Sequence, residues 1–251
     1  MSGSVFITGA SAGIGAACAR GFAAIGRDLI LVARRADRLK ALQAELAQRV
    51  QVRVFALDVT DRAAVDGLIE RERAVFDQVE ILVNNAGLAL GREPLQEGRP
   101  EDWFKMIDLN VNAFLYILHR TLPGLLRRGQ GHVINLGSAA GHWVYPNGNV
   151  YAATKFAVRA LSEGLRMDLH GKNIRVTCIS PGMVETEFSL VRFGDPDKAS
   201  AVYRGFTPLT AEDVADAVLW AASRPPHVNV QDIVLFPTSQ SRIDSVHRIA
   251  T

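Results

Sequence analysis

Short apolar segments alternate with amphipathic helical segments along almost the whole chain. The apolar segments predict seven strands, near residues 5–7, 28–32, 52–56, 81–83, 132–136, 175–179 and 233–235. Helical spacing of apolar residues between them predicts helices that include 64–72, 101–126, 151–169 and 211–222. Such alternation is typical of a parallel sheet with helices on both faces. The expected fold is therefore a doubly wound α/β sheet, formed by residues 1–251 as a single domain.

A glycine-rich turn follows the first strand directly. Residues 8–15 read Thr-Gly-Ala-Ser-Ala-Gly-Ile-Gly, and residues 16–23 read as a helix. Glycines let the backbone turn tightly and approach a ligand, and the free N–H groups of a helix start favour an anionic phosphate. The spacing departs from the Gly-x-Gly-x-x-Gly dinucleotide fingerprint, so the prediction depends on mechanism and not on pattern. The alternative is a tight strand-to-helix turn with no ligand.

Two arginines, Arg34 and Arg35, follow the second strand. An acidic residue at this place would bind the ribose hydroxyls of NAD, whereas a guanidinium pairs well with the 2′-phosphate of NADP. We therefore expect NADP as the cofactor. In the alternative interpretation the arginines only start the amphipathic helix 38–46, with Asp37 as its cap.

Ser138, Tyr151 and Lys155 provide groups for acid–base chemistry. Residues i and i+4 share one face of a helix, so the Lys155 ammonium can act on the Tyr151 phenol at short range. A free phenol has a pKa of about 10, and a nearby positive charge lowers it toward the range in which a general base works. The Ser138 hydroxyl would then hold the substrate oxygen. Taken alone, Tyr-x-x-x-Lys is a weak signal, because a solvated pair has the same spacing.

In combination, these motifs resemble the short-chain dehydrogenase/reductase family from end to end. The motifs that carry the resemblance are Thr8-Gly9-x-x-x-Gly13-x-Gly15, Leu57-Asp58-Val59, Asn84-Asn85-Ala86-Gly87, Asn110, Ser138, Tyr151-x-x-x-Lys155 and Pro181-Gly182. The resemblance implies a Rossmann fold and a catalytic set of Ser138, Tyr151, Lys155 and Asn110. In this scheme Asn110 distorts its helix and holds a water that leads protons from Lys155 to solvent. The alternative for Asn110 is an ordinary polar residue inside a helix.

The resemblance also implies how the cofactor is bound. Asp58 and Val59 flank the adenine ring, residues 85–87 line the wall beside the cofactor, and Lys155 holds the nicotinamide ribose. The whole implied cofactor-binding set is Thr8, Gly9, Ser11, Ala12, Gly13, Ile14, Gly15, Arg34, Arg35, Asp58, Val59, Asn85, Ala86, Gly87, Tyr151, Lys155, Pro181, Gly182, Val184 and Thr186. The glycine turn, Asn85, Ser138 and Pro181-Gly182 all follow predicted strands, so we expect them to meet at the carboxyl edge of the sheet.

Within the family, residues 184–193, 85–91 and 147–151 resemble a subgroup that oxidises small 3-hydroxy acids such as serine, L-allo-threonine and 3-hydroxypropionate. A related branch reduces sulfoacetaldehyde. Both kinds of substrate carry an anion, so Tyr145 and Arg192 are expected to bind substrate together with Ser138 and Tyr151, beneath a mobile lid at 186–206. The alternatives are a reductase of another carbonyl, such as a sugar or ketoacyl substrate, and a non-enzymatic dinucleotide sensor. A solvated loop arginine is the alternative for Arg192.

Composition restricts the remaining possibilities. The formal net charge is +2, and the short arginine pairs lack interleaved aromatic residues, so nucleic acid is a poor partner. The two cysteines argue against a disulfide framework, and no metal site is expected. No stretch is apolar enough to span a membrane, and residues 1–4 lead into the first strand without a signal peptide, which predicts a cytoplasmic protein. The polar tail, 237–251, is expected either to cross to a neighbouring subunit of a homotetramer, as in relatives, or to be frayed.

Overall fold

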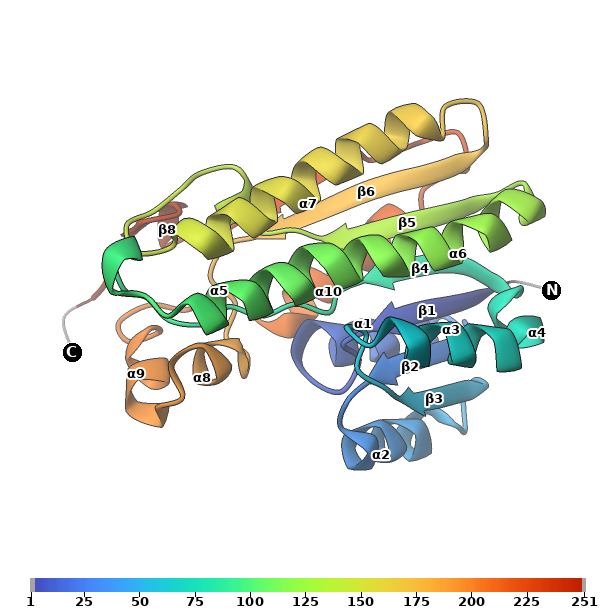
Figure 1. Ribbon diagram of the computed structural model, residues 1–251, viewed down its shortest axis with the longest axis horizontal. Coiled ribbons are helices and arrows are strands. Elements are labelled where there is room, and N and C mark those ends of the chain that lie inside the picture. The colour runs from blue at the N-terminus through green and yellow to red at the C-terminus, as the bar shows by residue number, and fades with distance from the viewer. Residues whose placement is uncertain (1–2, 250–251) are drawn as a thin grey trace.

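A seven-stranded parallel sheet organises the computed structural model, which describes residues 3–249 (Figure 1). The order of the strands is β3-β2-β1-β4-β5-β6-β7. Their bounds are β1 Ser4–Thr8, β2 Leu29–Ala33, β3 Val52–Ala56, β4 Val79–Asn84, β5 Gly131–Leu136, β6 Ile174–Pro181 and β7 Asp232–Leu235. In register, Ile7 of β1 lies between Leu31 of β2 and Val83 of β4. The predicted parallel sheet and doubly wound α/β fold are confirmed.

Helices cover both faces of this sheet. In Figure 1 the front layer contains α6 and α7, and α1 and α10 lie behind the sheet. One layer is built from α1 Gly13–Ala24, α2 Ala36–Leu46 and α10 Ala211–Ala222. The other is built from α3 Arg62–Arg71, α4 Arg73–Phe76, α6 Phe114–Arg128 and α7 Asn149–Asp168. The cap residues explain several boundaries: the Asp61 side chain accepts from the backbone of α3, and Thr210 and Asp213 form a capping box at α10.

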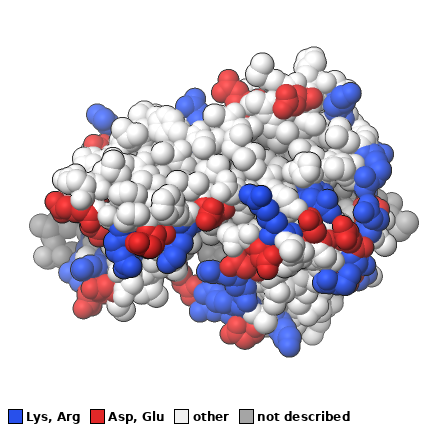
Figure 2. All heavy atoms as spheres, viewed as in Figure 1, with Lys and Arg blue, Asp and Glu red and all other residues white. Residues whose placement is uncertain are grey.

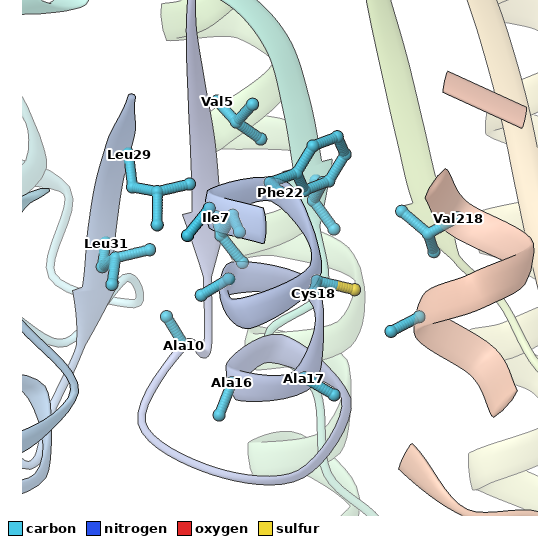
Figure 3. Packing of buried hydrophobic residues seen from close by; sticks show 14 of the residues in the cluster. Val5, Ile7, Ala10, Ala16, Ala17, Cys18, Phe22, Leu29, Leu31 and Val218 are labelled. Carbon is cyan, nitrogen blue, oxygen red and sulfur yellow. The ribbon is translucent and has the colours of Figure 1, made fainter. Parts of the chain in front are cut away.

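Each layer has its own apolar core, because successive strand side chains point to opposite faces of the sheet. Val5 and Ile7 of β1 pack with α1 and α10, whereas Phe6 packs with the layer that contains α6. Figure 3 shows Val5, Ile7 and Phe22 meeting between β1 and α1. Phe22 is completely buried, and complete burial of such a side chain contributes about 1.5–3 kcal/mol. The two cores hold the sheet in place and thereby fix the edge at which the loops that follow the strands meet.

The helix predicted over 101–126 is divided. Helix α5 covers Pro100–Ile107, a π-helical turn covers Asp108–Ala113, and α6 continues to Arg128, after which Gly129 adopts a left-handed conformation with φ 70°. The expected Asp37 cap is wrong: Arg35 occupies the N-cap position of α2, and Asp37 lies in the first turn. The π turn contains Asn110, and its cause becomes clear at the candidate site.

The expected lid contains two short helices, α8 Phe188–Phe193 and α9 Pro196–Ala201. The C-terminal segment forms a hairpin of β8 Gln240–Arg242 and β9 Ser245–Val246. Beyond the hairpin, Arg248 donates to the carbonyl oxygen of Val202 at 2.9 Å and lies over the Phe206 ring. The tail therefore contacts the lid of its own chain. The expectations for residues 1–4 and for the tail 237–251 also covered residues 1, 2, 250 and 251. These four residues lie outside the described residues.

No helix within residues 3–249 has the length and apolarity needed to cross a membrane. Over the same range, no cluster of three or more His, Cys, Asp or Glu side chains is arranged to hold a metal ion.

Candidate functional site

A cleft of about 800 Å³ opens at the carboxyl edge of the sheet. It includes the point between β1 and β4 where the strand order reverses, which is where doubly wound folds bind ligands. The cleft brings together most residues of the predicted site, namely Gly9, Ser11, Ala12, Gly13, Ile14, Arg34, Arg35, Asp58, Val59, Asn85, Ala86, Gly87, Ser138, Tyr151, Lys155, Pro181, Gly182, Val184 and Thr186. The expected convergence of the strand-following segments is confirmed.

The glycine turn has a conformation that other residues would not adopt. Gly9 and Gly13 have φ values of 66° and 50°, in the left-handed region. A Cβ atom on Gly15 would collide with the carbonyl oxygen of Gly9 and lie 2.7 Å from Nδ2 of Asn85. The turn therefore needs its glycines in order to fold closely against the end of β4. It leads into α1 with the free N–H groups of that helix start beside the cleft.

Thr8 does not line the cleft, but it joins the glycine turn to the next strand of the sheet. Its buried Oγ1 accepts hydrogen bonds from the backbone N–H groups of Asn85 and Ala86, both at 3.0 Å. In return, Nδ2 of Asn85 donates to the carbonyl oxygen of Thr8 at 2.9 Å. Together these bonds hold two walls of the cleft at a fixed separation.

A basic cluster lies at one end of the cleft and consists of Arg34, Arg35 and Arg38. The Arg34 side chain is 69% exposed and lies 3.9 Å from Asp58. The guanidinium of Arg35 donates to Ser11 Oγ at 3.2 Å, and both Arg35 and Arg38 pair with Glu187. Figure 2 shows basic side chains gathered between α8 and α2. Sequence reasoning missed Arg38, although its place one turn after Arg35 at the start of a helix was a usable signal.

The cleft and the basic cluster together suit a dinucleotide that carries an additional ribose phosphate. The glycine turn leaves backbone N–H groups free for a pyrophosphate, and the arginines offer forked donors that match phosphate oxygens. Asp58 and Val59 line the cleft on the same side as the basic cluster. These residues could therefore hold the adenosine half of such a cofactor.

Tyr151 and Lys155 lie on one face of α7, as predicted, and both are buried. The ammonium Nζ of Lys155 donates to the carbonyl oxygen of Leu136 at 2.9 Å and lies 5.9 Å from the centre of the Tyr151 ring. Burial lowers the pKa of Lys155 to about 8. Ser138, at the end of β5, lines the same cleft.

The expected effect of Lys155 on Tyr151 is not what the structure shows. Burial raises the pKa of the Tyr151 phenol, with a further contribution from Tyr145. The groups that lower this pKa are the Ser138 hydroxyl and the Arg192 guanidinium. Desolvation dominates because the phenol lies in an apolar cluster with Met106 and Ala152.

Asn110 explains the π turn between α5 and α6. Its Oδ1 accepts from the backbone N–H of Leu88 at 2.9 Å, and its Nδ2 donates to the Leu88 carbonyl at 2.8 Å and to Thr154 Oγ1 at 3.1 Å. A Cβ on Gly87 would approach both Oδ1 of Asn110, at 3.2 Å, and Nζ of Lys155, at 3.6 Å. The helix distortion implied for Asn110 is present, and it places the amide on the same side of Gly87 as the ammonium.

Arg192 and Tyr145 lie together beside Tyr151, and neither of them lines the large cleft. The Arg192 guanidinium donates to Tyr145 OH and to the carbonyl oxygen of Gly91, both at 2.9 Å. It lies 5.8 Å from the centre of the Tyr151 ring and lines a small cavity of about 30 Å³. Arg192 thus belongs to α8 and is held in place, in contrast to a solvated loop arginine. Three of its five N–H donors remain for a ligand.

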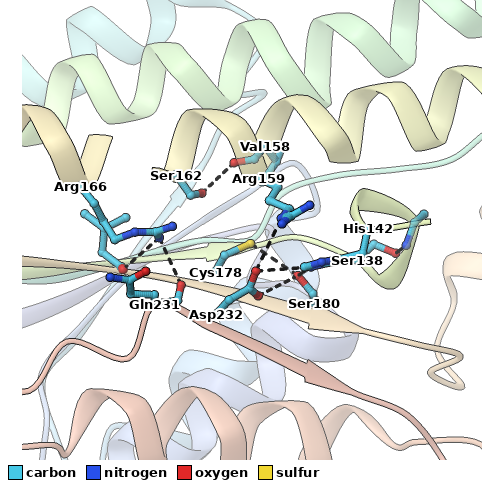
Figure 4. A network of polar contacts seen from close by, with 12 residues as sticks. Ser138, His142, Val158, Arg159, Ser162, Arg166, Cys178, Ser180, Gln231 and Asp232 are labelled. Atoms are coloured by element: carbon cyan, nitrogen blue, oxygen red, sulfur yellow. Dashed lines mark hydrogen bonds and ion pairs between the residues drawn. The ribbon is translucent and has the colours of Figure 1, made fainter. Parts of the chain in front are cut away.

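A polar network behind Ser138 connects β6, β7 and α7 (Figure 4). Nε2 of His142 lies 3.1 Å from Ser180 Oγ and 3.4 Å from an Asp232 oxygen, and Arg159 lies 3.9 Å from the same carboxylate. Both His142 contacts use one ring nitrogen, whereas a Ser-His-Asp triad uses a different nitrogen for each partner. We therefore interpret the network as a brace for the turn that follows Ser138.

Comparison with known proteins agrees with this geometry. The family model described as short chain dehydrogenase matches residues 4–193. Over 247 residues the chain is 47% identical to the NADP-dependent 3-hydroxy acid dehydrogenase YdfG of Salmonella typhi, across 97% of this chain and 99% of that protein. Over 243 residues it is 48% identical to sulfoacetaldehyde reductase 2 of Chromohalobacter salexigens, across 96% of both.

A solved structure extends the similarity to three dimensions. The closed form of serine dehydrogenase complexed with NADP+ matches with a TM-score of 0.90 and 45% identity, over 98% of this chain and 99% of that one. The family model and these full-length relatives lead to one conclusion: the chain belongs to the short-chain dehydrogenase family.

Proposed function

We propose that this protein is an NADP-dependent dehydrogenase of small 3-hydroxy acids such as serine, L-allo-threonine or 3-hydroxypropionate. One observation carries the proposal: a single cleft joins the basic cluster, suited to a ribose phosphate, to the hydroxyl groups of Ser138 and Tyr151. The names of the relatives support the cofactor and the substrate class, because they include an NADP-dependent 3-hydroxy acid dehydrogenase and a serine dehydrogenase complexed with NADP+.

Different residues are proposed to bind different parts of the dinucleotide. Backbone N–H groups of residues 9–15 receive the pyrophosphate, Asp58 and Val59 flank the adenine, and Arg34 and Arg35 bind the 2′-phosphate. Residues 85–87 form the wall behind the ribose, and the nicotinamide side is closed by Pro181, Gly182, Val184 and Thr186. Thr8 and Gly15 act from behind the cleft by shaping the turn.

The proposed chemistry uses Tyr151 as the general base in oxidation and as the general acid in reduction. When bound beside Tyr151, NADP would supply the hydride acceptor and a positive charge that favours the phenolate. Ser138 donates a hydrogen bond to the substrate oxygen as negative charge develops there. Lys155, which has a pKa of about 8, passes the proton onward by way of a water held near Asn110.

The substrate carboxylate is proposed to bind Arg192 and Tyr145. Arg192 is held by Gly91 and Tyr145 but keeps donors free, and it lies close to the face of Tyr151. A sulfonate is an anion of similar size, so a sulfoacetaldehyde reductase is a second candidate function. The observation that supports this second candidate is the similarity to a sulfoacetaldehyde reductase. Residues 186–206, with α8 and α9, are proposed to form the lid over either substrate.

The proposed assembly is a homotetramer in the cytoplasm. Two aromatic side chains on neighbouring helices, Phe104 of α5 and Phe156 of α7, are 63% and 36% exposed and would be covered by a second subunit. The two cysteines, Cys18 and Cys178, are free thiols, which suits a reducing compartment.

Turnover of a substrate panel tests the proposal. Candidate substrates are L- and D-serine, L-allo-threonine, 3-hydroxypropionate and 3-hydroxyisobutyrate with NADP, and sulfoacetaldehyde with NADPH. Arg192→Ala should raise KM for the preferred anion by about 10- to 150-fold, because a charge-assisted hydrogen bond contributes about 1.5–3 kcal/mol. Arg204→Ala, in the same segment, is the matched control and should behave as wild type. If Arg192→Ala weakens turnover of the neutral propane-1,3-diol equally, the proposed anion contact is wrong.

A further inference from the structure

The carboxylate of Glu187 occupies one nitrogen on each of two arginines of the basic cluster, Arg35 and Arg38. Its Oε2 lies 2.8 Å from Nη1 of Arg35, and its Oε1 lies 2.6 Å from Nη1 of Arg38. Hydrogen bonds from these two arginines hold the pKa of Glu187 below its ordinary value. A carboxylate that bridges two guanidinium groups is arranged as two oxygens of a phosphate would be.

Glu187 is also the first residue before α8, the helix that carries the substrate side of the site. Phe188, its neighbour, packs against the Tyr151 ring with a centroid distance of 5.7 Å. Five residues after Glu187, Arg192 bonds to Gly91 and Tyr145. Helix α8 is therefore fixed at one end to the basic cluster and at the other end to the substrate pocket.

We infer that the 2′-phosphate of NADP reaches Arg38 as well as Arg34 and Arg35, and that Glu187 competes with it for Arg35 and Arg38 and thereby sets how strongly NADP is preferred over NAD. This inference rests on the proposed function, because it takes NADP as the cofactor. The two Nη1 atoms that face Glu187 cannot serve the carboxylate and a phosphate in the same place at once. A 2′-phosphate, with its greater charge, displaces the carboxylate, whereas the 2′-hydroxyl of NAD leaves the ion pairs intact.

Two consequences follow from this competition. A 2′-phosphate that binds these two Nη1 atoms must break the contacts of Glu187, so Glu187 weakens NADP binding and has little effect on NAD. The 2′-phosphate also releases Glu187, near the start of the lid, from Arg35 and Arg38, which links the adenosine end of the cleft to the segment that covers the substrate.

Calorimetric titration with 2′,5′-ADP and 5′-AMP tests the inference without turnover. These probes differ in the 2′-phosphate and lack the nicotinamide. Glu187→Gln keeps the shape of the side chain and removes its charge, and Glu185→Gln, two residues away and exposed, is the matched control. For Glu187→Gln the Kd of 2′,5′-ADP should fall roughly 3- to 10-fold, the range expected from two half-exposed ion pairs, and the Kd of 5′-AMP should stay within twofold.

The outcomes separate this inference from the proposed function. If wild-type protein binds 2′,5′-ADP no better than 5′-AMP, NADP is not the cofactor and the proposed function fails. If wild-type protein prefers 2′,5′-ADP but Glu187→Gln binds it equally or more weakly, the cofactor assignment stands and competition by Glu187 is wrong. If Glu185→Gln shows the same gain in affinity, the gain comes from the change in net charge and not from the contacts of Glu187. That result would also overturn the inference.

Discussion

Replacing Thr8 by valine should destabilise the protein and weaken its cofactor site without creating a cavity. Valine has nearly the volume of threonine, so the change removes only the hydroxyl group. Two backbone N–H groups, those of Asn85 and Ala86, then lose the acceptor that lies 3.0 Å from each. An unsatisfied buried donor costs about 1–3 kcal/mol, and because this backbone is only partly buried we expect a total of about 2–4 kcal/mol.

Urea denaturation measures the change in the free energy of unfolding, and titration with NADPH measures cofactor affinity. Thr8→Ser, which keeps the hydroxyl group and loses one methyl group, is the control and should cost about 1 kcal/mol. NADPH should bind more weakly to Thr8→Val than to Thr8→Ser, since the glycine turn is no longer fixed to the end of β4. A loss of stability below about 0.5 kcal/mol in Thr8→Val would refute the role assigned to these two bonds.

Two further predictions concern the turn and the core. Gly15→Ala should abolish measurable NADPH binding while leaving the protein folded, as checked by circular dichroism, because its Cβ collides with the Gly9 carbonyl; unchanged binding would show that the turn can relax. Burial holds the pKa of His132 down, at about 3 against an ordinary 6.5, so the unfolded chain takes up a proton below pH 6.5 and the folded chain does not. The free energy of unfolding is therefore unaffected by His132 above pH 6.5 and decreases as pH falls toward 3. The decrease should reach about 2 kcal/mol by pH 5, and His132→Gln should lack it. Equal acid sensitivity of the two proteins in urea titrations would contradict this assignment.

The parts of the fold that were predictable from sequence are those set by local pattern. Parallel strands buried on both faces are continuous apolar runs, so segments such as Leu29–Ala33 stood out to within one residue of their bounds. The glycine turn was equally predictable, because few residues can take φ values such as 66° at Gly9. Strand-following residues then meet at one edge by topology alone.

Features that depend on distant partners were not predictable in this way. The distortion at Asn110 was implied by the family resemblance alone, because it is stabilised by bonds to Leu88 and Thr154, which lie 22 and 44 residues away in sequence. The ion pair of Arg38 with Glu187 spans 149 residues, so neither side chain was recognised as part of the site. The direction of the pKa shift of Tyr151 was also mistaken, because desolvation depends on burial that only the folded structure reveals.

Turnover by Tyr151→Phe, set against its affinity for NADPH, tests the central claim most directly. The assay follows NADP reduction at about 340 nm with the preferred 3-hydroxy acid, and a parallel titration measures NADPH binding. We predict a fall in kcat of at least about 100-fold, the contribution of general acid–base catalysis, with NADPH affinity within a few-fold of wild type. Turnover close to that of wild type would contradict the assignment of Tyr151 as the proton-transfer group, and with it the proposed dehydrogenase mechanism.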